Sequence, residues 1–360
     1  MGKNRITKEE INVAGGQERR IYLDIIRIVA TFLVIFTHTG DIGSKLYIYG
    51  NFGAFRKAIY LLADILRCVN IPFFFMISGA LLLGKEENYK TLLFKRIFKY
   101  GLALMMMSYF YFVVYYHNTW SDFGTFLRQL CSEYVIGLYW FLYSYLGYLL
   151  VLPFLRKMVK QMTDTDFKYF AILGIIFKSI SVIIMGLLGW NTFLIPFYFA
   201  TDALFYPVIG YFLSKIEIES IDGRKIYMGG VISILCIVCT GVLMHWEACS
   251  IGEYRETYLF SLLVIPAIYE FCLIRKLFSR IKLGYNVRRM VVYLSDNCFG
   301  VYLFSVFAQI KMINLYYSLD ALTVHKCPLL CSFIYVAIVM LVEALCVSII
   351  RKIPVIRRYL

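Results

Sequence analysis

Ten long apolar stretches limit what this chain can fold into more than any other feature of its sequence. A helix that crosses a bilayer needs about 20 mostly apolar residues. Hydrophobic residues make up 61% of the 360 residues and charged residues 17%, whereas soluble domains have roughly 45–50% and about 25%. A water-soluble enzyme is therefore nearly excluded. A disordered chain is excluded because such chains are poor in apolar and aromatic residues. We predict an all-α, polytopic integral membrane protein.

The apolar stretches predict ten spanning helices and, with the basic residues, an orientation. The expected ranges are Ile21–Thr37, Ala58–Leu83, Leu92–Tyr116, Tyr134–Leu155, Tyr169–Leu188, Phe193–Ser214, Ile226–Trp246, Thr257–Ile274, Met290–Met312 and Pro328–Ile350. With the N-terminus inside, 27 of the 37 Lys and Arg residues fall on cytoplasmic segments and six on outer loops. Such a bias is typical of cytoplasmic loops. We therefore expect cytoplasmic tails at 1–20 and 351–360 and a membrane domain at 21–350.

Topology thus accounts for the net charge of +14, and no nucleic-acid partner is expected. The remaining four basic residues, Arg27, Arg67, Lys178 and Lys311, lie inside predicted spans. Ionisable groups inside a membrane are costly and often mark function.

The first predicted span carries Asp24, Arg27 and, at its outer end, His38. Arg27 and His38 are eleven positions apart. This spacing is close to three helical turns, so the two lie on one helix face about 16 Å apart along the axis. One face thus offers a fixed cation inside and a titratable imidazole outside. The alternative is that Arg27 reaches the headgroups and His38 is an interfacial polar residue.

The second predicted span holds Asp64 and Arg67, which could pair at a spacing of three. Pro72 is expected to kink this helix in mid-membrane. Ser78 and Gly79 allow close contact with another backbone. A kinked packing helix without catalytic function is the alternative.

The third and fourth spans begin with basic and aromatic residues, respectively. Lys95, Arg96 and Lys99 could hold an anionic cytosolic ligand such as the phosphates of coenzyme A, or they could serve only as topology signals. Tyr139 and Trp140 match an aromatic belt at the outer interface.

No metal site and no permanently bound cofactor are expected. Cys236 and Cys239 have zinc-like spacing but lie in an apolar span without a second pair, so we interpret them as small buried side chains.

Four segments, in order, resemble motifs of the acyltransferase 3 family of bacterial membrane acyltransferases. They are LDIIRIVATFLVIFTH with Arg27 and His38, RCVNIPFFFMISGALLLGKE with Arg67 and Ser78, FKRIFK with Arg96 and Lys99, and LYWFLYSYLGYLLVLPFLRK around Trp140. YPVIGYFL and NCFGVYLF resemble two weaker late motifs. The resemblance covers the whole membrane domain of that family.

The resemblance implies a multi-pass protein of the bacterial plasma membrane that transfers an acyl group, usually acetyl, from cytosolic acyl-CoA. The implied acceptor is a hydroxyl of a cell-surface polysaccharide or its lipid-linked precursor, and membrane lipid surrounds the protein. His38 would be the general base or acyl-relaying residue, and Arg27 would position the donor or stabilise developing charge. The donor-binding residues would be Arg96, Lys99, Ser78 and Arg67, with Asp24 and Trp140 in supporting positions.

Two positions depart from the family pattern. Ser305 stands where many relatives have a second histidine, which puts any role of that histidine in doubt. Tyr145 stands where some polysaccharide-modifying relatives carry Glu, which favours the subgroup that acts on lipid-linked or small glycans. No extracytoplasmic domain follows Leu360, so we expect the membrane domain to deliver the acyl group directly.

Two other functions stay open. One is a transporter or flippase for a glycan or acyl carrier, with Asp24, Arg27 and Lys178 along its path, although no internal repeat is evident. The other is an inactive sensor or scaffold. The acyltransferase hypothesis predicts that His38, Arg27 and Ser78 line one cavity that the cytosol reaches near Arg96.

Overall fold

The structure is a computed structural model, which describes residues 19–353 except 116–121, 190–196, 219–220, 255, 257 and 282. The described residues form helices and connecting turns and contain no strand. The elements in order are α1 (Ile21–Thr37), η2 (Gly40–Ile42), α2 (Leu46–Tyr49), α3 (Ala54–Arg67), α4 (Asn70–Leu82), α5 (Tyr89–Thr91), η3 (Leu92–Ile97), α6 (Phe98–Phe110), η4 (Tyr111–Tyr115), α7 (Phe123–Ser132), η5 (Gly137–Tyr139), α8 (Trp140–Gln161), α9 (Asp164–Ile175), η6 (Ile176–Ile180), α10 (Ser181–Leu188), η7 (Tyr198–Ala200), α11 (Asp202–Lys215), α12 (Gly223–Ile251), α13 (Val264–Arg280), α14 (Tyr285–Leu322) and α15 (Pro328–Ile350). The prediction of an all-α membrane protein is confirmed.

Seven helical segments of the described chain are long and apolar enough to cross a bilayer. They are Ala54–Leu82, Tyr89–Tyr115, Gly137–Gln161, Asp164–Leu188, Gly223–Ile251, Tyr285–Leu322 and Pro328–Ile350. The other three predicted spans correspond to α1, α11 and α13, which have 17, 14 and 17 residues. The number of ten and the orientation therefore stay predictions. Tyr116, residues 193–196 and Thr257 of the predicted ranges, and residues 1–18 and 354–360 of the predicted tails, lie outside the described residues.

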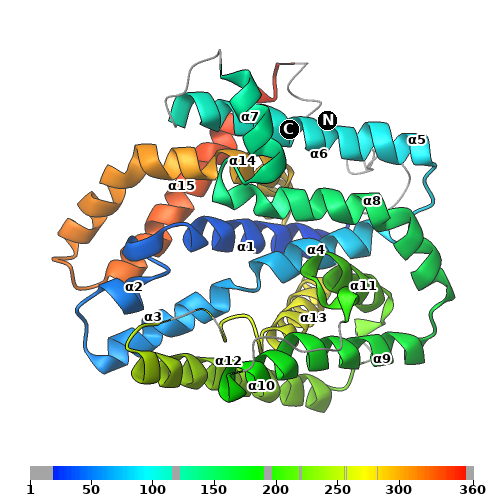
Figure 1. The fold of residues 1–360 in the computed structure, drawn as a ribbon, viewed down its shortest axis with the longest axis horizontal. Coiled ribbons are helices and arrows are strands. Elements are labelled where there is room, and N and C mark those ends of the chain that lie inside the picture. The colour runs from blue at the N-terminus through cyan, green and yellow to red at the C-terminus, as the bar shows by residue number, and fades with distance from the viewer. Residues whose placement is uncertain are drawn as a thin grey trace, which may run out of the picture.

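Helix α1 runs through the middle of the bundle and packs against α14, α4, α13 and α15 (Figure 1). The most apolar part of Ala54–Leu82 is also central, with 67% of it buried, whereas only 17% of the corresponding part of Gly223–Ile251 is buried. Ile234, Leu235 and Val242 of α12 are among the large apolar side chains that stay exposed. Exposed apolar side chains on a long helix are suited to contact with lipid.

The second predicted span is interrupted just before Pro72. Helix α3 ends at Arg67, Cys68 and Val69 form the break, and α4 begins at Asn70. Pro72 is the third residue of α4. The first N–H groups of a helix have no intrahelical acceptor, so proline is tolerated there. Cys68 lies four residues before Pro72, where a proline removes the helical hydrogen bond and its ring clashes with the carbonyl group. The predicted kink is therefore present, as a break on the N-terminal side of the proline.

Helices α4 and α11 pack with their backbones in close contact. A Cβ atom added at Gly79 would overlap the backbone of Pro207, and one added at Gly210 would overlap the backbone of Met76. The predicted close approach at Gly79 is confirmed. The contact holds one face of α4, so that Phe74 and Ser78 are presented to α1 and α8.

The two ends of the described chain meet on α14. Arg19 forms an ion pair with the carboxylate of Asp296 at 2.8 Å, and Arg351 donates to the Asp296 carbonyl oxygen at 2.8 Å.

Candidate functional site

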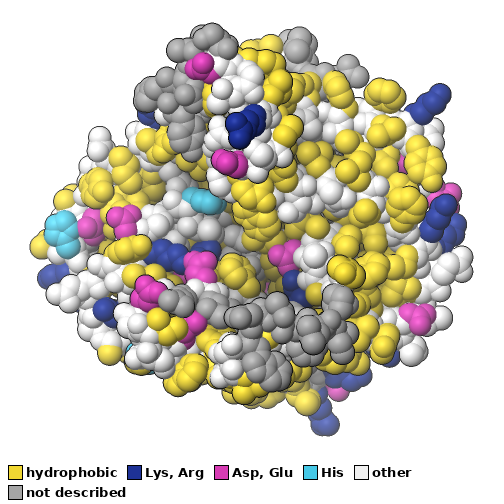
Figure 2. All heavy atoms as spheres, in the orientation of Figure 1, with side chains coloured by type: hydrophobic (Ala, Val, Ile, Leu, Met, Phe, Trp, Pro, Cys, Tyr) yellow, Lys and Arg dark blue, Asp and Glu magenta, His cyan; other side chains and the backbone are white. Residues whose placement is uncertain are grey.

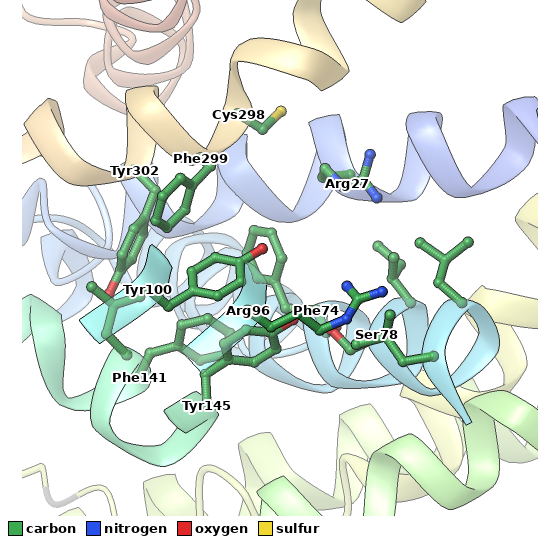
Figure 3. A pocket seen from close by; sticks show the side chains of 14 residues that line it. Arg27, Phe74, Ser78, Arg96, Tyr100, Phe141, Tyr145, Cys298, Phe299 and Tyr302 are labelled. Atoms are coloured by element: carbon green, nitrogen blue, oxygen red, sulfur yellow. The ribbon is translucent and has the colours of Figure 1, made fainter. Parts of the chain in front are cut away.

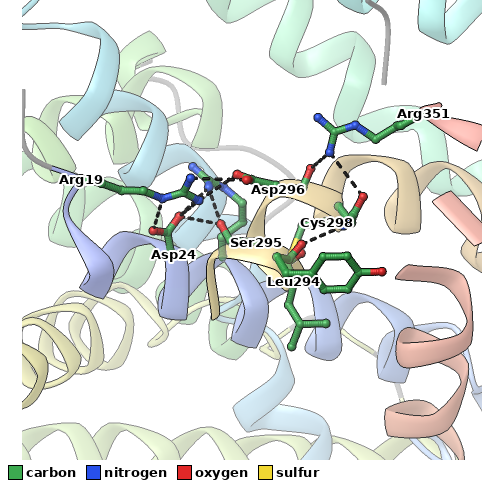
Figure 4. A network of polar contacts seen from close by, with 10 residues as sticks. Arg19, Asp24, Leu294, Ser295, Asp296, Cys298 and Arg351 are labelled. Atoms are coloured by element: carbon green, nitrogen blue, oxygen red, sulfur yellow. Dashed lines mark hydrogen bonds and ion pairs between the residues drawn. The ribbon is translucent and has the colours of Figure 1, made fainter. Parts of the chain in front are cut away.

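Arg27 on α1 belongs to a polar network that reaches α14. Figure 4 shows Asp24, Ser295 and Asp296 of this network. Arg27 Nη1 donates to the Ser295 hydroxyl at 2.7 Å and to Asp24 Oδ1 at 3.2 Å. Ser295 donates to the same carboxylate at 2.7 Å, and Arg19 forms two further hydrogen bonds with it. The buried Asp24 carboxylate is therefore compensated. The described contacts engage only Nη1 of Arg27, so its other donors can bind an anion.

Arg27 lines a cavity of about 190 Å³, called here the Arg27 cavity. Figure 3 shows Arg27 projecting from α1 on one side and Arg96 and Ser78 on the other. Side chains of α4, α6, α8 and α14 complete the wall. The lining residues are Arg27, Phe74, Ile77, Ser78, Leu81, Leu82, Arg96, Tyr100, Phe141, Leu142, Tyr145, Cys298, Phe299 and Tyr302.

Arg96 is oriented by Glu87, whose carboxylate lies between two arginines. Arg96 Nε donates to Glu87 at 3.0 Å, and Arg156 Nη2 donates to it at 2.9 Å. Arg156 also donates to the Leu82 carbonyl at the end of α4. The hydrogen bond from Arg96, and with it that from Arg156, lowers the pKa of the Glu87 carboxyl to about 2, although burial opposes the shift.

His38 is the first residue beyond α1 and lines a second cavity, of about 280 Å³, called here the His38 cavity. The chain reverses directly after it, because Gly40 adopts a left-handed conformation with φ +56° that glycine accepts without strain. Lys45 N–H then donates to the Gly40 carbonyl at 2.8 Å. This turn places Lys45 beside the histidine. The lining residues are Val34, Thr37, His38, Lys45, Arg67, Asn70, Ile71, Phe74, Leu138, Trp140, Phe141, Glu256, Phe260 and Tyr302.

The charges at the His38 cavity are balanced around Asp64, which is fully buried. Arg67 Nε donates to one carboxylate oxygen, and the Tyr47 hydroxyl donates to the other at 3.0 Å. Lys45 lies 3.7 Å from Asp64 and also pairs with Glu256. The predicted pair of Asp64 and Arg67 is confirmed.

The break between α3 and α4 also positions Asn70 at this cavity. Its side-chain amide donates to the Thr37 hydroxyl at 3.0 Å, and that hydroxyl donates to the Leu33 carbonyl of α1. Arg67 Nη1 reaches the same hydroxyl at 3.4 Å. The last turn of α1 is thereby fixed next to the start of α4.

The His38 imidazole itself has no hydrogen-bond partner among the residues that the structure describes. Its side chain faces the space of the His38 cavity and is exposed there, and the residues that line this cavity surround it. This burial is the main cause that lowers the pKa of His38 to about 4, and the positive charge of Arg67 adds to it. The imidazole is therefore neutral near pH 7 and has a nitrogen lone pair free to accept a proton. Figure 2 shows a hollow on this face where a histidine lies above basic and acidic side chains.

A third cavity of about 420 Å³, the Lys178 cavity, adjoins the His38 cavity, with which it shares Ile71 and Phe260. Lys178 lies in the π-helical segment η6 and pairs with Asp202 at the start of α11. It also donates to the Ala200 carbonyl at 2.8 Å. The charge of Lys178 is thus compensated.

The comparisons with known proteins give one match. The chain matches the family model described as an acyltransferase domain, acyltransferase 3, over residues 20–350. The chain belongs to the acyltransferase 3 family. No curated protein and no solved structure matches. Together with the apolar helices, the family shows that the protein is a membrane acyltransferase.

The structure of this acyltransferase groups the predicted site residues into two cavities rather than one. Arg27, Ser78 and Arg96 line one cavity as expected, but His38 lines its neighbour together with Arg67 and Trp140. The three aromatic residues Phe74, Phe141 and Tyr302 line both cavities and lie between them. The expectation of one common cavity is therefore corrected to two cavities that share a wall.

Two further predicted residues lie outside the lining of the acyltransferase cavities. Lys99 Nζ is 5.9 Å from the ring centre of Phe299 and 6.0 Å from that of Tyr100, both of which line the Arg27 cavity. Asp24 acts on this cavity only through Arg27. Of the two positions that depart from the family pattern, Tyr145 lines the Arg27 cavity. Ser305 is buried within α14, and its hydroxyl donates to the Tyr302 carbonyl.

The sequence did not single out Glu87, Lys45, Asn70 or Glu256 of the acyltransferase. Glu87 and Lys45 are loop residues that look like ordinary solvated charges. Asn70, two residues before Pro72, is a polar residue in an apolar run and gave the one signal that could have been used.

Proposed function

We propose that this acyltransferase moves an acetyl group from cytosolic acetyl-CoA to a hydroxyl of a cell-surface polysaccharide or its lipid-linked precursor in the bacterial plasma membrane. One observation carries the proposal: a cavity with two arginines and a cavity with a neutral histidine share one aromatic wall. A two-substrate transfer needs a donor pocket and an acceptor pocket that meet at the reacting atoms.

The Arg27 cavity is suited to the phosphates of the donor. The network around it contains four arginines, Arg19, Arg27, Arg96 and Arg156, and three carboxylates, Asp24, Glu87 and Asp296. One positive charge is left uncompensated. Guanidinium groups bind phosphate oxygens through several parallel N–H donors. The predicted orientation places this cavity toward the cytosol, where acyl-CoA is found.

The His38 cavity is suited to a neutral hydroxyl acceptor. Lys45 and Arg67 are balanced by Asp64 and Glu256, so the cavity has no excess charge to attract an anion. Trp140 and Phe260 add apolar surface to the wall, and such surface can pack against the face of a sugar ring.

In the proposed reaction, the acceptor oxygen attacks the thioester carbonyl carbon while His38 takes the hydroxyl proton. The tetrahedral intermediate carries a negative oxygen, which Arg67 or Lys45 can stabilise from the same cavity. The C–S bond then breaks, the ester forms, and the sulfur leaves as thiolate. His38 returns its proton to the thiolate, so that the products are the acetyl ester and coenzyme A.

Arg27 is assigned to donor binding rather than to the intermediate. Arg27 and His38 are about 16 Å apart along α1, and the aromatic residues separate their cavities. The long pantetheine arm of the donor can connect phosphates at Arg27 with a thioester at His38. Ser78 lies on this route, whereas Arg67 is reassigned from the donor phosphates to the reacting end.

The test uses the full chain in lipid vesicles with labelled acetyl-CoA and a glycan extract. The label is expected to enter the glycan with wild type and with Ser305→Ala, but not with His38→Ala. Normal transfer by a folded His38→Ala variant would remove His38 from the mechanism. Loss of transfer in Ser305→Ala would show that the departure in the late motif matters.

A transporter or flippase remains the second candidate, and one observation favours it. The Arg27, His38 and Lys178 cavities form a row, because neighbours share lining residues. Such a row could pass a glycan without chemistry. Vesicles that move a fluorescent glycan in the absence of any acyl-CoA would support this function, and strict dependence on acetyl-CoA would exclude it.

A further inference from the structure

Three aromatic side chains form the wall between the Arg27 cavity and the His38 cavity. Phe74 comes from α4, Phe141 from α8 and Tyr302 from α14, and each lines both cavities. We call these three side chains the aromatic partition. Figure 3 shows Phe141 and Tyr302 at one end of the Arg27 cavity, away from Arg27, and Phe74 next to Ser78.

The Arg27 cavity and the His38 cavity are separate in this structure, and two pairs of rings of the partition are in contact. The ring centres of Phe74 and Phe141 are 5.5 Å apart, and those of Phe141 and Tyr302 are 6.0 Å apart. These distances are typical of aromatic rings in contact. A pantetheine arm cannot pass between rings in contact, so at least one ring has to move before a thioester from the Arg27 cavity reaches His38.

The three rings differ in how firmly they are held. The Tyr302 hydroxyl donates to the Leu138 carbonyl at 2.7 Å, and its side chain is buried. Phe141 also packs against Phe75 and Tyr145. Phe74 is only partly buried, and its one ring contact in the described chain is with Phe141. Tyr302 is therefore the most firmly held side of the partition. Phe74 packs against the surrounding core but makes the fewest ring contacts, so it is the least firmly held ring.

We propose that the aromatic partition is a gate for the thioester end of the donor, that Phe74 opens it, and that it selects acyl groups by their width. This inference rests on the proposed function. A linear acyl group is no wider than the unbranched cysteamine and β-alanine part of the pantetheine arm, which follows it through the gate, so a gate that passes this part also passes the group. A branched acyl group is wider than this part and meets the ring of Tyr302. The gate therefore favours acetyl and other unbranched groups.

The experiment compares butyryl-CoA with isobutyryl-CoA, which have the same atoms and differ in width. The full-length protein in lipid vesicles receives each thioester with the same glycan extract, and chromatography measures the free coenzyme A released. Wild type is expected to prefer butyryl-CoA. Phe74→Ala is expected to raise the ratio of isobutyryl to butyryl rates by about 10-fold or more, the range in which one methyl group is discriminated in an apolar pocket.

Phe75→Leu is the matched control, together with Phe74→Leu. Phe75 is the next residue of α4 and touches Phe141, but it lines neither cavity. Phe75→Leu should keep the wild-type ratio, Phe74→Leu should shift it partly, and binding of coenzyme A without an acyl group, measured by calorimetry, should not change.

The outcomes separate the gate from the function on which it rests. Equal use of both isomers by wild type, or an unchanged ratio in folded Phe74→Ala, overturns the gate and leaves the acyltransferase proposal standing. A wild-type protein that binds no coenzyme A and uses no thioester overturns the proposed function, and the gate with it.

Discussion

The Arg27 cavity and the His38 cavity lie side by side, but their ionisable groups are arranged in opposite ways. At the Arg27 cavity, arginines are oriented by carboxylates and still exceed them in charge. At the His38 cavity, cations and carboxylates balance, and the histidine has no partner in the described chain. The first arrangement favours a bound anion, whereas the second favours a neutral substrate and proton transfer.

The largest effect should come from removing the proton acceptor without touching the arginines. His38→Ala is expected to reduce kcat by about 10²- to 10⁴-fold, the usual contribution of a positioned base. The dissociation constant of coenzyme A, measured by calorimetry, should stay within about 2-fold, because the donor phosphates are bound in the other cavity.

His245→Ala is the control for this substitution. His245 is an exposed histidine that lines neither cavity and is bonded to Tyr254. It should leave kcat unchanged. If His38→Ala weakens donor binding as strongly as it lowers kcat, the assignment of donor binding to the Arg27 cavity and of proton transfer to the His38 cavity is wrong.

The second effect is expected at Arg96. Arg96→Gln should raise the KM for acetyl-CoA by about 10- to 100-fold with little change in kcat, because a hydrogen bond to a charged group contributes about 1.5–3 kcal/mol. The variant should fold, since Glu87 keeps its bond with Arg156.

Lys160→Gln is the control for Arg96→Gln. It shows what happens when a basic residue that only helps to set the membrane orientation is removed. Lys160 is one of the basic residues that the orientation places in the cytoplasm, and it is exposed and paired with Glu86. Its loss should not change the KM for the donor. If Arg96→Gln and Lys160→Gln change the KM for acetyl-CoA equally, Arg96 is a topology signal and does not bind the donor.

The sequence predicted the scaffold better than the division of the site. Apolar length identified the helices, and the start and end of Pro328–Ile350 agree with the structure, because membrane spans depend on local composition. The spacing of Arg27 and His38 predicted a shared helix face; Arg27 lies on α1 and His38 directly follows its last residue. The sequence could not show that Phe74, Phe141 and Tyr302 from three helices meet between them, since helix packing depends on contacts between distant segments.

Arg67 shows why residue roles were harder to predict than residue positions. The resemblance implied a donor-binding role, and the pairing with Asp64 followed from their spacing. The break at Cys68 and Val69 then turns Arg67 toward His38 instead of toward Arg96. Pro72 gave a signal for the break four residues before it. Which cavity Arg67 lines depends on contacts between distant segments, such as that of Asn70 with Thr37, and these cannot be read from the sequence.

The smallest expected effect is a shift in pH dependence, which measures how Arg67 acts on His38. Because the neutral imidazole is the active form and its pKa is lowered to about 4, kcat/KM should persist well below pH 6.5 and fall only as the pH approaches 4.

Arg67→Gln removes one positive charge that disfavours the imidazolium, so the fall in kcat/KM should move to higher pH. The fall should stay below pH 6.5, because burial is the larger cause of the low pKa of His38 and remains.

Arg67→Lys keeps the charge and should keep the pH profile of kcat/KM. Arg56→Gln, an exposed change on the same helix α3, should also keep it. The Glu87 carboxyl does not interfere in the upper part of this range. Its lowered pKa gives stability that is present above the ordinary value of 4.5 and lost only as the pH falls toward 2. If kcat/KM of the wild type falls at pH 6.5, or if Arg67→Gln does not move the fall, then burial and the charge of Arg67 do not keep His38 neutral. The proposed difference between the two cavities would then be wrong.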